Sequence, residues 1–187
     1  IWMKLRGVSF AFPRAARGWA VVSGLLFTFE FTCLFMALDG TTVSRASIIF
    51  YSMPVWLTIA ANFLIPGERL TRLKIIGLGM AMSGVALALS DRSGGHVSWT
   101  GDILALTSAF CWAGIALLVR VTPLEKVPPA QQLMCQVAIS GPILVLIAPL
   151  FGPLIRDVQM IHLAGLGFQI IAVASLGFLA WFWLMSV

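Results

Sequence analysis

The chain has 187 residues, of which 60% are hydrophobic and only 10% are charged. Soluble domains hold about 45–50% apolar and about 25% charged residues, so this composition excludes an ordinary soluble domain and indicates a protein embedded in a lipid bilayer. The net charge of +5 is spread along the chain instead of forming one basic patch, which argues against nucleic acid as a partner.

Six apolar segments are long enough to cross a bilayer, because a spanning helix needs about 20 mostly apolar residues. They are too long, and alternate too weakly, to be the strands of a membrane barrel. We therefore predict an all-α integral membrane protein of the plasma membrane, which in a bacterium is the inner membrane. The predicted spans cover residues 18–38, 43–65, 73–90, 101–121, 131–151 and 162–187.

The basic residues are distributed in a way that predicts the orientation of the chain. Most of the twelve Lys and Arg residues lie before the first span and in the turns near residues 69 and 126. Cytoplasmic connections are enriched in Lys and Arg, so the residue 1 end and these two turns are predicted to be cytoplasmic.

Glu30 lies near the middle of the first predicted span. An acid at the bilayer centre costs about 2.5–3.5 kcal/mol on insertion scales, so it must face the bundle interior or water. One interpretation is a site that couples transport to a proton or another cation. The other is a neutral carboxyl group that bonds to a neighbouring helix for packing. Both interpretations stay open.

One face of the second predicted span is polar and is expected to avoid lipid. Pro54, at its centre, removes a helical hydrogen bond and predicts a kink that either faces a cavity or serves packing. Tyr51 and Thr58 are candidates for lining a substrate path. The face is made of Ser44, Ser47, Tyr51, Pro54, Thr58 and Asn62, at spacings of three or four residues.

The second span ends abruptly in a charged turn that contains Glu68. Glu68 is predicted to pair with a basic residue of this turn, and the candidates are Arg69, Arg72 and Lys74. We interpret Glu68 and Arg69 as a cytoplasmic gate or latch. An ordinary loop charge is the alternative, because surface ion pairs are worth only about 0–1 kcal/mol.

The third span is rich in small residues, which let helix backbones approach closely, so a packing helix is expected. Thr71 is its predicted N-cap. On the fourth span Asp102 lies near the helix start, where a negative charge favours the helix dipole. Ser108 and Trp112 share one face of this span, and Trp112 either lines a pocket or packs.

The fifth span carries a second polar face with Gln132, Gln136 and Ser140 at intervals of four residues. Gln136 is a further candidate for the substrate path, although water at the cytoplasmic end also explains part of this face. The sixth span ends in Trp181, Phe182 and Trp183, which are typical of helix anchors at a membrane interface.

Motifs for catalysis and for cofactors are absent from the sequence. It has no P-loop, and neither His96 nor His162 has the spacing of a metal ligand. The cysteines, Cys33, Cys111 and Cys135, lie within spans and form no Cys-x-x-Cys motif. We therefore predict no enzyme, no cofactor and no metal site.

Residues 44–89, SRASIIFYSMPVWLTIAANFLIPGERLTRLKIIGLGMAMSGVALAL, resemble the EamA domain of the drug/metabolite transporter superfamily. The shared pattern is a helix with a central proline, a Gly-Glu at its end, a short basic turn and a Gly-rich helix. Residues 101–120, GDILALTSAFCWAGIALLVR, look like the start of a second EamA repeat, and the final FLAWFWLMSV also fits.

The resemblance implies a ten-helix transporter bundle made of two five-helix repeats of inverted topology. On that map residues 1–17 are a cytoplasmic basic segment, and residues 18–90 hold the last three helices of the first repeat. Residues 91–100 form an outer loop, and residues 101–187 hold the first three helices of the second repeat. The chain is then expected to be truncated at both ends.

The leading hypothesis is a secondary active transporter of small metabolites or drugs that works by alternating access without ATP hydrolysis. Proton coupling is one option, and a homodimer is an alternative to a monomer. The alternative function is a non-transporting membrane scaffold whose polar groups only pack. The residues predicted to line the path or to couple transport are Glu30, Tyr51, Thr58, Trp112 and Gln136.

Overall fold

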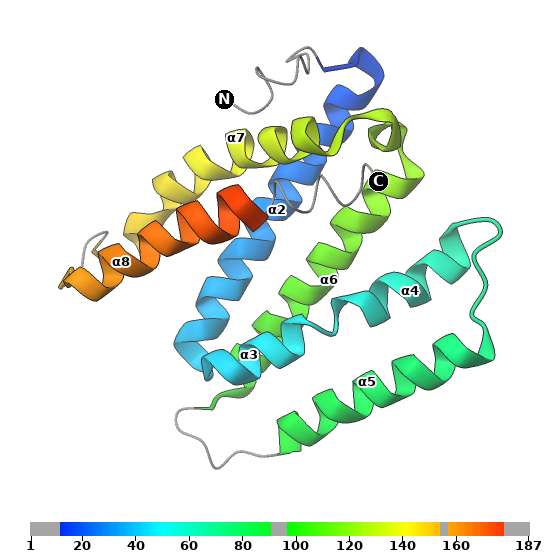
Figure 1. The fold of residues 1–187 in the computed structure, drawn as a ribbon, viewed down its shortest axis with the longest axis horizontal. Coiled ribbons are helices and arrows are strands. Elements are labelled where there is room, and N and C mark those ends of the chain that lie inside the picture. The colour runs from blue at the N-terminus through cyan, green and yellow to red at the C-terminus, as the bar shows by residue number, and fades with distance from the viewer. Residues whose placement is uncertain (1–11, 91–96, 154–156, 178–187) are drawn as a thin grey trace. The chain divides into compact units, whose positions relative to one another are not determined.

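The computed structural model describes residues 12–90, 97–153 and 157–177. These residues form helices joined by short connections, and no strand occurs among them, which confirms the predicted all-α class (Figure 1). The main helices are α2 (Arg14–Gly40), α3 (Val43–Phe50), α4 (Met53–Leu64), α5 (Arg72–Ser90), α6 (Trp99–Val121), α7 (Pro129–Ile147) and α8 (Met160–Phe168). The short helices are η1 (Pro123–Lys126), η2 (Ala148–Phe151) and the π-helix η3 (Gln169–Gly177).

Helices lie at five of the six positions where a span is predicted, and over the described part of the sixth, residues 162–177. Four of the described stretches are long and apolar enough to cross a membrane: Arg14–Gly40, Val43–Leu64, Trp99–Val121 and Pro129–Phe151. Residues 178–187, with the predicted aromatic anchor Trp181 to Trp183, are outside the described residues, as are His96, Arg92 and Arg156. The chain divides into two compact units, residues 1–144 and residues 145–187.

The first unit is built around α2 and α6, which lie side by side and run antiparallel (Figure 1). At one end of the pair, the backbone N–H and the hydroxyl of Ser98 both donate to the Gly40 carbonyl, at 2.9 and 2.7 Å. At the other end, Ala16 and Ala20 of α2 pack against Leu124 and Val127, which follow α6. The small buried residues along this contact allow the two helices to approach closely.

Gly101 is the residue that makes the closest approach between α2 and α6 possible. A Cβ atom added at Gly101 would lie 2.7 Å from the Gly40 carbonyl carbon and 2.9 Å from its oxygen. The Gly40 backbone cannot move away without breaking its bonds to Ser98, so this position accepts only glycine without a shift of the helices.

The second predicted span, residues 43–65, is long and apolar enough to cross a membrane, and it consists of two helices separated by a break just before Pro54, where the sequence predicts a kink. Residues Tyr51 and Ser52 interrupt it, so that α3 ends before them and α4 begins after them. Pro54 is the second residue of α4, where its missing N–H costs little because the first turn has no intrahelical acceptor. The Ser52 hydroxyl donates to the Ile49 carbonyl at 2.6 Å and accepts from Trp56 Nε1 at 2.9 Å. Side-chain bonds thus stabilise the interruption.

Helix α5 begins where the sequence predicts, because the Thr71 hydroxyl accepts a hydrogen bond from the Lys74 backbone N–H at 3.3 Å. The helix contacts α3 and α4. Its glycines face away from the rest of the described chain, since a Cβ atom at Gly77, Gly79 or Gly84 would meet nothing within 4 Å. These three glycines therefore do not mediate packing among the residues that the structure describes.

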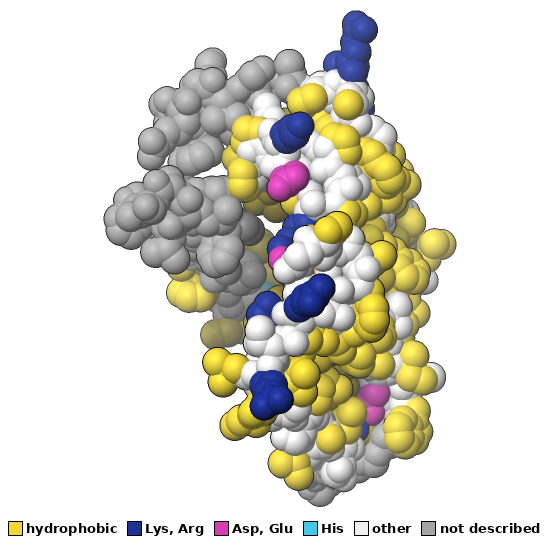
Figure 2. All heavy atoms as spheres, turned by 90° about the vertical axis from the view of Figure 1, so that its right-hand side faces the viewer, with side chains coloured by type: hydrophobic (Ala, Val, Ile, Leu, Met, Phe, Trp, Pro, Cys, Tyr) yellow, Lys and Arg dark blue, Asp and Glu magenta, His cyan; other side chains and the backbone are white. Residues whose placement is uncertain are grey.

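Basic side chains gather at one end of the first unit, in a band bordered by apolar side chains (Figure 2). This end holds the start of α2, the turn from α4 to α5 and the end of α6. At the opposite end the described cation, Arg45, is buried. The basic residues described at the first end are Arg14, Arg17, Arg69, Arg72, Lys74, Arg120 and Lys126.

Candidate functional site

Glu30 lies in the interface between α2 and α6 and is 1% exposed. Its Oε1 accepts a hydrogen bond from the Ser108 hydroxyl at 3.3 Å. Its Oε2 is buried and has no hydrogen-bond partner among the described residues. A buried polar atom without a partner costs about 1–3 kcal/mol, and more when it is charged. The interior therefore contains a carboxyl group whose hydrogen-bonding capacity is only partly used by the described residues.

Aromatic rings border the contact between Glu30 and Ser108. Phe27 lies about one turn before Glu30 on α2, and Trp112 lies about one turn after Ser108 on α6. The ring centroids of Phe27 and Trp112 are 6.2 Å apart, and those of Trp112 and Phe50 are 6.3 Å apart. Trp112, a residue singled out in the sequence, thus joins α2 to the end of α3 beside the buried acid.

The structure does not gather all the predicted path residues around Glu30. Tyr51 is 69% exposed, and it reaches this region through the ring of Phe50, whose centroid is 5.9 Å away. Thr58 lies further along α4, and its hydroxyl donates to the Pro54 carbonyl at 2.7 Å. The interruption before α4 separates these two residues into different segments.

Gln136 is buried between α7 and α2, where its Nε2 donates to the Ser23 hydroxyl at 2.8 Å. Ser23 is seven residues before Glu30, or about 10 Å along the helix axis. A Cβ atom at Gly24 would lie 2.8 Å from the side chain of Ile139, so α7 packs closely against α2 here. Gln136 therefore belongs to a second polar contact on α2.

A buried ion pair joins Arg45 of α3 to Asp102 of α6, and the sequence analysis missed it. Arg45 Nε lies 2.7 Å from Asp102 Oδ1, and Arg45 Nη2 lies 2.9 Å from Oδ2, so the contact is bidentate. The two side chains are 4% and 6% exposed. Arg45 Nη2 also donates to the Leu89 carbonyl of α5 at 2.8 Å. We call Arg45 and Asp102 the Asp102 pair.

A second ion pair joins Arg120, near the end of α6, to Glu68 in the turn after α4. Arg120 Nη2 contacts Glu68 Oε1, and Nη1 lies 3.3 Å from Oε2. This finding corrects the predicted partner of Glu68, which was a basic residue of its own turn. The side chains are 43% and 33% exposed. We call Arg120 and Glu68 the Arg120 pair.

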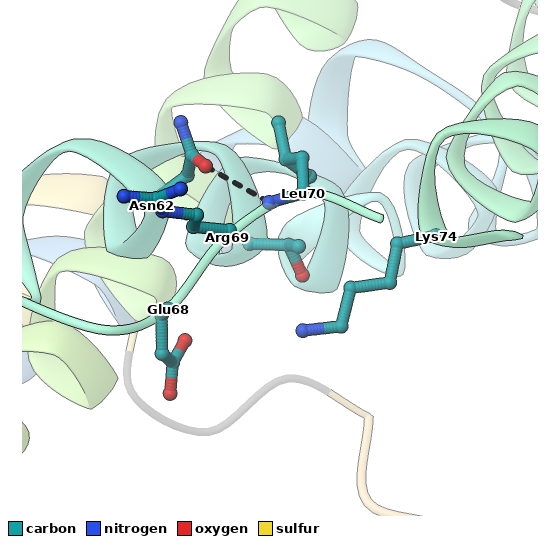
Figure 3. A pocket seen from close by; sticks show the side chains of 6 residues that line it. Asn62, Glu68, Arg69, Leu70 and Lys74 are labelled. Atoms are coloured by element: carbon teal, nitrogen blue, oxygen red, sulfur yellow. Dashed lines mark hydrogen bonds between the residues drawn. The ribbon is translucent and has the colours of Figure 1, made fainter. Parts of the chain in front are cut away.

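Arg69, the other predicted latch residue, points into a small surface pocket beside Glu68 (Figure 3). Within it the Asn62 side chain accepts a hydrogen bond from the Leu70 backbone N–H at 2.9 Å, which fastens the turn to α4. The pocket is lined by Thr58, Asn62, Glu68, Arg69, Leu70 and Lys74. It therefore combines the inner half of the predicted polar face with the charged turn.

No group of three or more His, Cys, Asp or Glu side chains that could hold a metal ion occurs in the described parts of the chain. The three cysteines are free thiols. The buried polar side chains of the described residues include those of the Glu30 contact, the Gln136 contact and the Asp102 pair.

The sequence contains a signal for the Asp102 pair that the analysis did not use. Arg45 and Asp102 each lie a few residues inside the end of a predicted span, and a small or hydroxyl residue precedes each of them. Charges at such positions are costly unless they meet an opposite charge. In the sequence analysis, Asp102 is assigned only to the helix dipole and Arg45 is given no role in a contact.

Comparison with known proteins gives a family match over the first half of the chain. The EamA-like transporter family model matches residues 1–90. No solved structure matches the chain.

Curated relatives are also transporters by name. A probable amino-acid metabolite efflux pump of Salmonella typhimurium is 31% identical over 93 residues, and its namesake in Escherichia coli is 33% identical over 93 residues. Each match covers 48% of this chain but only 31% of the relative. The uncharacterized transporter YvbV of Bacillus subtilis is 39% identical over 67 residues, which cover 36% of this chain and 22% of that protein.

The family match, the transporter relatives and the apolar helices agree with one another. They make the chain an integral membrane protein and point to a transporter instead of an enzyme. Over residues 1–90, the chain is similar to the EamA-like transporter family.

Proposed function

We propose that the protein is a secondary active transporter that moves a small metabolite across the plasma membrane by alternating access, without ATP hydrolysis. The family match and the names of the relatives support this class of activity. Two of these relatives are named as amino-acid metabolite efflux pumps, which supports an amino-acid metabolite as substrate and export as direction.

The observation that carries the proposal is the unpaired carboxylate oxygen of Glu30. It is buried at the contact of two long apolar helices. An apolar side chain at this position would make the protein more stable, so stability does not explain the acid. Intramembrane acids of this kind commonly mark proton relays and substrate paths. The proposed role of Glu30 is to bind and release a proton, or a cationic group of the substrate, during each cycle.

The other proposed path residues lie on either side of Glu30. Trp112 contributes an apolar wall beside the acid, and Gln136 contributes an amide about 10 Å further along α2. Tyr51 would line the path at the helix interruption, and Thr58 would line it on α4. The basic end of the first unit, with the residue 1 end, is proposed to be cytoplasmic, in agreement with the charge bias.

The repeat assignment made from the sequence is also part of the proposal. Residues 18–90 would close the first five-helix repeat and residues 101–187 would open the second. The matching of the family model to residues 1–90 supports a repeat boundary near residue 90.

The test compares Glu30→Gln with the wild type in proteoliposomes that contain the complete protein. Efflux of radiolabelled amino-acid metabolites is measured with and without an imposed pH gradient. We expect Glu30→Gln to lose the response to the gradient, and Glu125→Gln, which changes an exposed acid outside the spans, to behave as the wild type. Unchanged coupled transport by Glu30→Gln would remove Glu30 from the mechanism.

A stability measurement separates transport from the scaffold alternative. If Glu30 serves the mechanism at a cost in stability, Glu30→Met stabilises the protein in detergent by about 1–3 kcal/mol, because an apolar side chain removes the buried oxygen that has no partner among the described residues. If the carboxyl group only packs, the same change destabilises the protein, and no transport is found. Thermal unfolding of the substituted protein and of the wild type, at equal detergent and protein concentrations, shows whether the substitution raises or lowers the stability.

A further inference from the structure

The two ion pairs lie at opposite ends of the same helix. Asp102 is in the first turn of α6 and Arg120 is in its last turn. The 18 residues between them span about 27 Å at 1.5 Å per residue, which is close to the thickness of the hydrocarbon core. Each pair therefore closes one end of the contact that α6 makes with its neighbours.

Both pairs connect α6 to the interrupted helix. Arg45, in the Asp102 pair, is on α3, and Glu68, in the Arg120 pair, follows α4. The charges are reversed between the two ends: α6 supplies the acid to one pair and the base to the other. The interruption at Tyr51 and Ser52 lies between the two connections.

An interruption at this place permits independent movement of the two ends. A continuous helix would carry Arg45 and Glu68 as one rigid body, so that both pairs would open together. At the interruption, Pro54 has no N–H for a helical bond, and the backbone N–H groups of Ser52 and Val55 donate to carbonyls only three residues back, so the regular helical pattern is already broken there. The Ser52 side chain adds two further bonds. The backbone there can bend without the loss of a regular helical hydrogen-bond ladder.

The two ion pairs differ in their burial and in the number of helices that they join. The Asp102 pair is bidentate and buried, and Arg45 also bonds to the Leu89 carbonyl of α5. Thr41, which follows α2, donates to Asp102 Oδ1 at 3.5 Å. This pair thus joins α2, α3, α5 and α6 at one point. The Arg120 pair is partly exposed to solvent and joins α6 only to the turn after α4.

From these observations, and on the basis of the proposed transport function, we infer that the Asp102 pair and the Arg120 pair are the two gates of the transporter. They open alternately as α3 or α4 bends away from α6 about the interruption at Tyr51 and Ser52. In this structure both gates are closed, and the Glu30 contact is enclosed between them.

The test measures how each gate controls the accessibility of its own half of the interrupted helix. In the complete protein, with Cys33, Cys111 and Cys135 replaced by Ala, a single reporter cysteine is placed at Ser47 on α3 or at Thr58 on α4. Both positions are half-buried, so the reporters are matched. Initial rates of labelling with a membrane-impermeant maleimide are measured from each side of sealed vesicles, without substrate.

Opening the Asp102 pair should affect the Ser47 reporter alone. We expect Asp102→Asn to raise its labelling rate about tenfold, within the roughly 5- to 150-fold range of couplings between sites. The double variant Arg45→Asp with Asp102→Arg should restore the slow rate. Asp39→Asn, an exposed acid at the same end, is the control and should change neither reporter.

Opening the Arg120 pair should affect the Thr58 reporter alone. We expect Glu68→Gln or Arg120→Gln to raise its labelling rate about fivefold or less, because an exposed pair is worth only about 0–1 kcal/mol. Arg72→Gln, an exposed cation at the same end, is the control. If both reporters respond together to each variant, or neither responds to any, the inference is overturned even when transport is intact.

A second measurement holds the contact between Arg45 and Asp102 closed instead of opening it. Cysteines at Arg45 and Asp102 are joined by a reducible bifunctional thiol reagent after reconstitution. We expect the cross-link to stop transport, reduction to restore it, and labelling at Thr58 to continue. Transport at the wild-type rate by the cross-linked protein would overturn the inference. Absence of transport by the wild type, with selective labelling of the two reporters, would overturn the proposed function alone.

Discussion

At the scale of single residues, the two buried acids of the described residues have different surroundings. Asp102 has a bidentate arginine partner, so both of its oxygens are satisfied. Glu30 has one oxygen on the Ser108 hydroxyl and one without a partner among the described residues. The first arrangement holds helices together, and the second leaves bonding capacity that a proton or a ligand could use.

Removal of one member of a buried ion pair leaves the other charge uncompensated. We therefore expect Asp102→Ala to destabilise the protein by about 3–5 kcal/mol, measured by unfolding in mixed micelles. Asp39→Ala removes an exposed acid at the same end and should change the free energy of unfolding by less than about 0.5 kcal/mol. Equal effects of the two substitutions would show that the Asp102 pair contributes nothing to stability.

At the scale of secondary-structure elements, the contact between α2 and α6 depends on backbone-to-backbone approach. A methyl group at Gly101 would meet the Gly40 carbonyl group, not the end of a flexible side chain. Backbone atoms that are fixed by hydrogen bonds cannot yield locally, so the two helices themselves must move apart.

We expect Gly101→Ala to destabilise the protein by about 1–3 kcal/mol, the usual cost of overpacking. Gly79→Ala is the matched substitution, because a Cβ atom there meets nothing within 4 Å. It should leave stability unchanged or raise it by up to about 1 kcal/mol, through the better helix propensity of Ala. Thermal unfolding of the two variants checks the contrast, and a larger loss at Gly79 than at Gly101 would contradict it.

The interruption between α3 and α4 is the second feature at this scale. Pro54→Ala restores an N–H group and removes the steric bar to a continuous helix. We expect transport to slow several-fold, because a continuous helix couples its two ends, while the folded state stays at least as stable. Pro142→Ala, within the uninterrupted helix α7, should leave the transport rate unchanged. Rates in proteoliposomes and unfolding midpoints measured on the same preparations test both statements.

At the scale of the whole molecule, the charge distribution of the first unit matches the bias of membrane proteins toward basic cytoplasmic ends. The turn with Arg72 lies at the basic end, whereas Asp39 lies near the other end of α2. Because α2 and α6 run antiparallel, the start of α2 and the end of α6 share the basic end, and Asp39 lies near the opposite end of the pair.

We expect a cysteine at Arg72 to react with an impermeant maleimide only from the cytoplasmic side of the membrane. A cysteine at Asp39 should react only from the outer side. Whole cells and inverted vesicles, labelled in parallel, give the two measurements. The reverse pattern would invert the proposed orientation, and labelling of both cysteines from one side would contradict the predicted number of crossings between them.

The sequence by itself determined the class of the protein, the positions of its helices and the face on which several polar residues lie. These properties depend on apolar content and on local periodicity, which a linear pattern records. It also identified Glu30, since an acid within an apolar span is visible without any knowledge of its neighbours.

Only the tertiary structure decided which side chains meet. Arg45 and Asp102 are separated by 57 residues, and Arg120 and Glu68 by 52, so no local pattern pairs them. The interruption at Tyr51 and Ser52 is different, because its side-chain bonds are local; Pro54 alone is compatible with a kink, a break or a helix start, and the structure shows a break followed by a helix start. Partners are decided when helices dock against one another, and docking depends on the shapes of surfaces that lie far apart in the sequence.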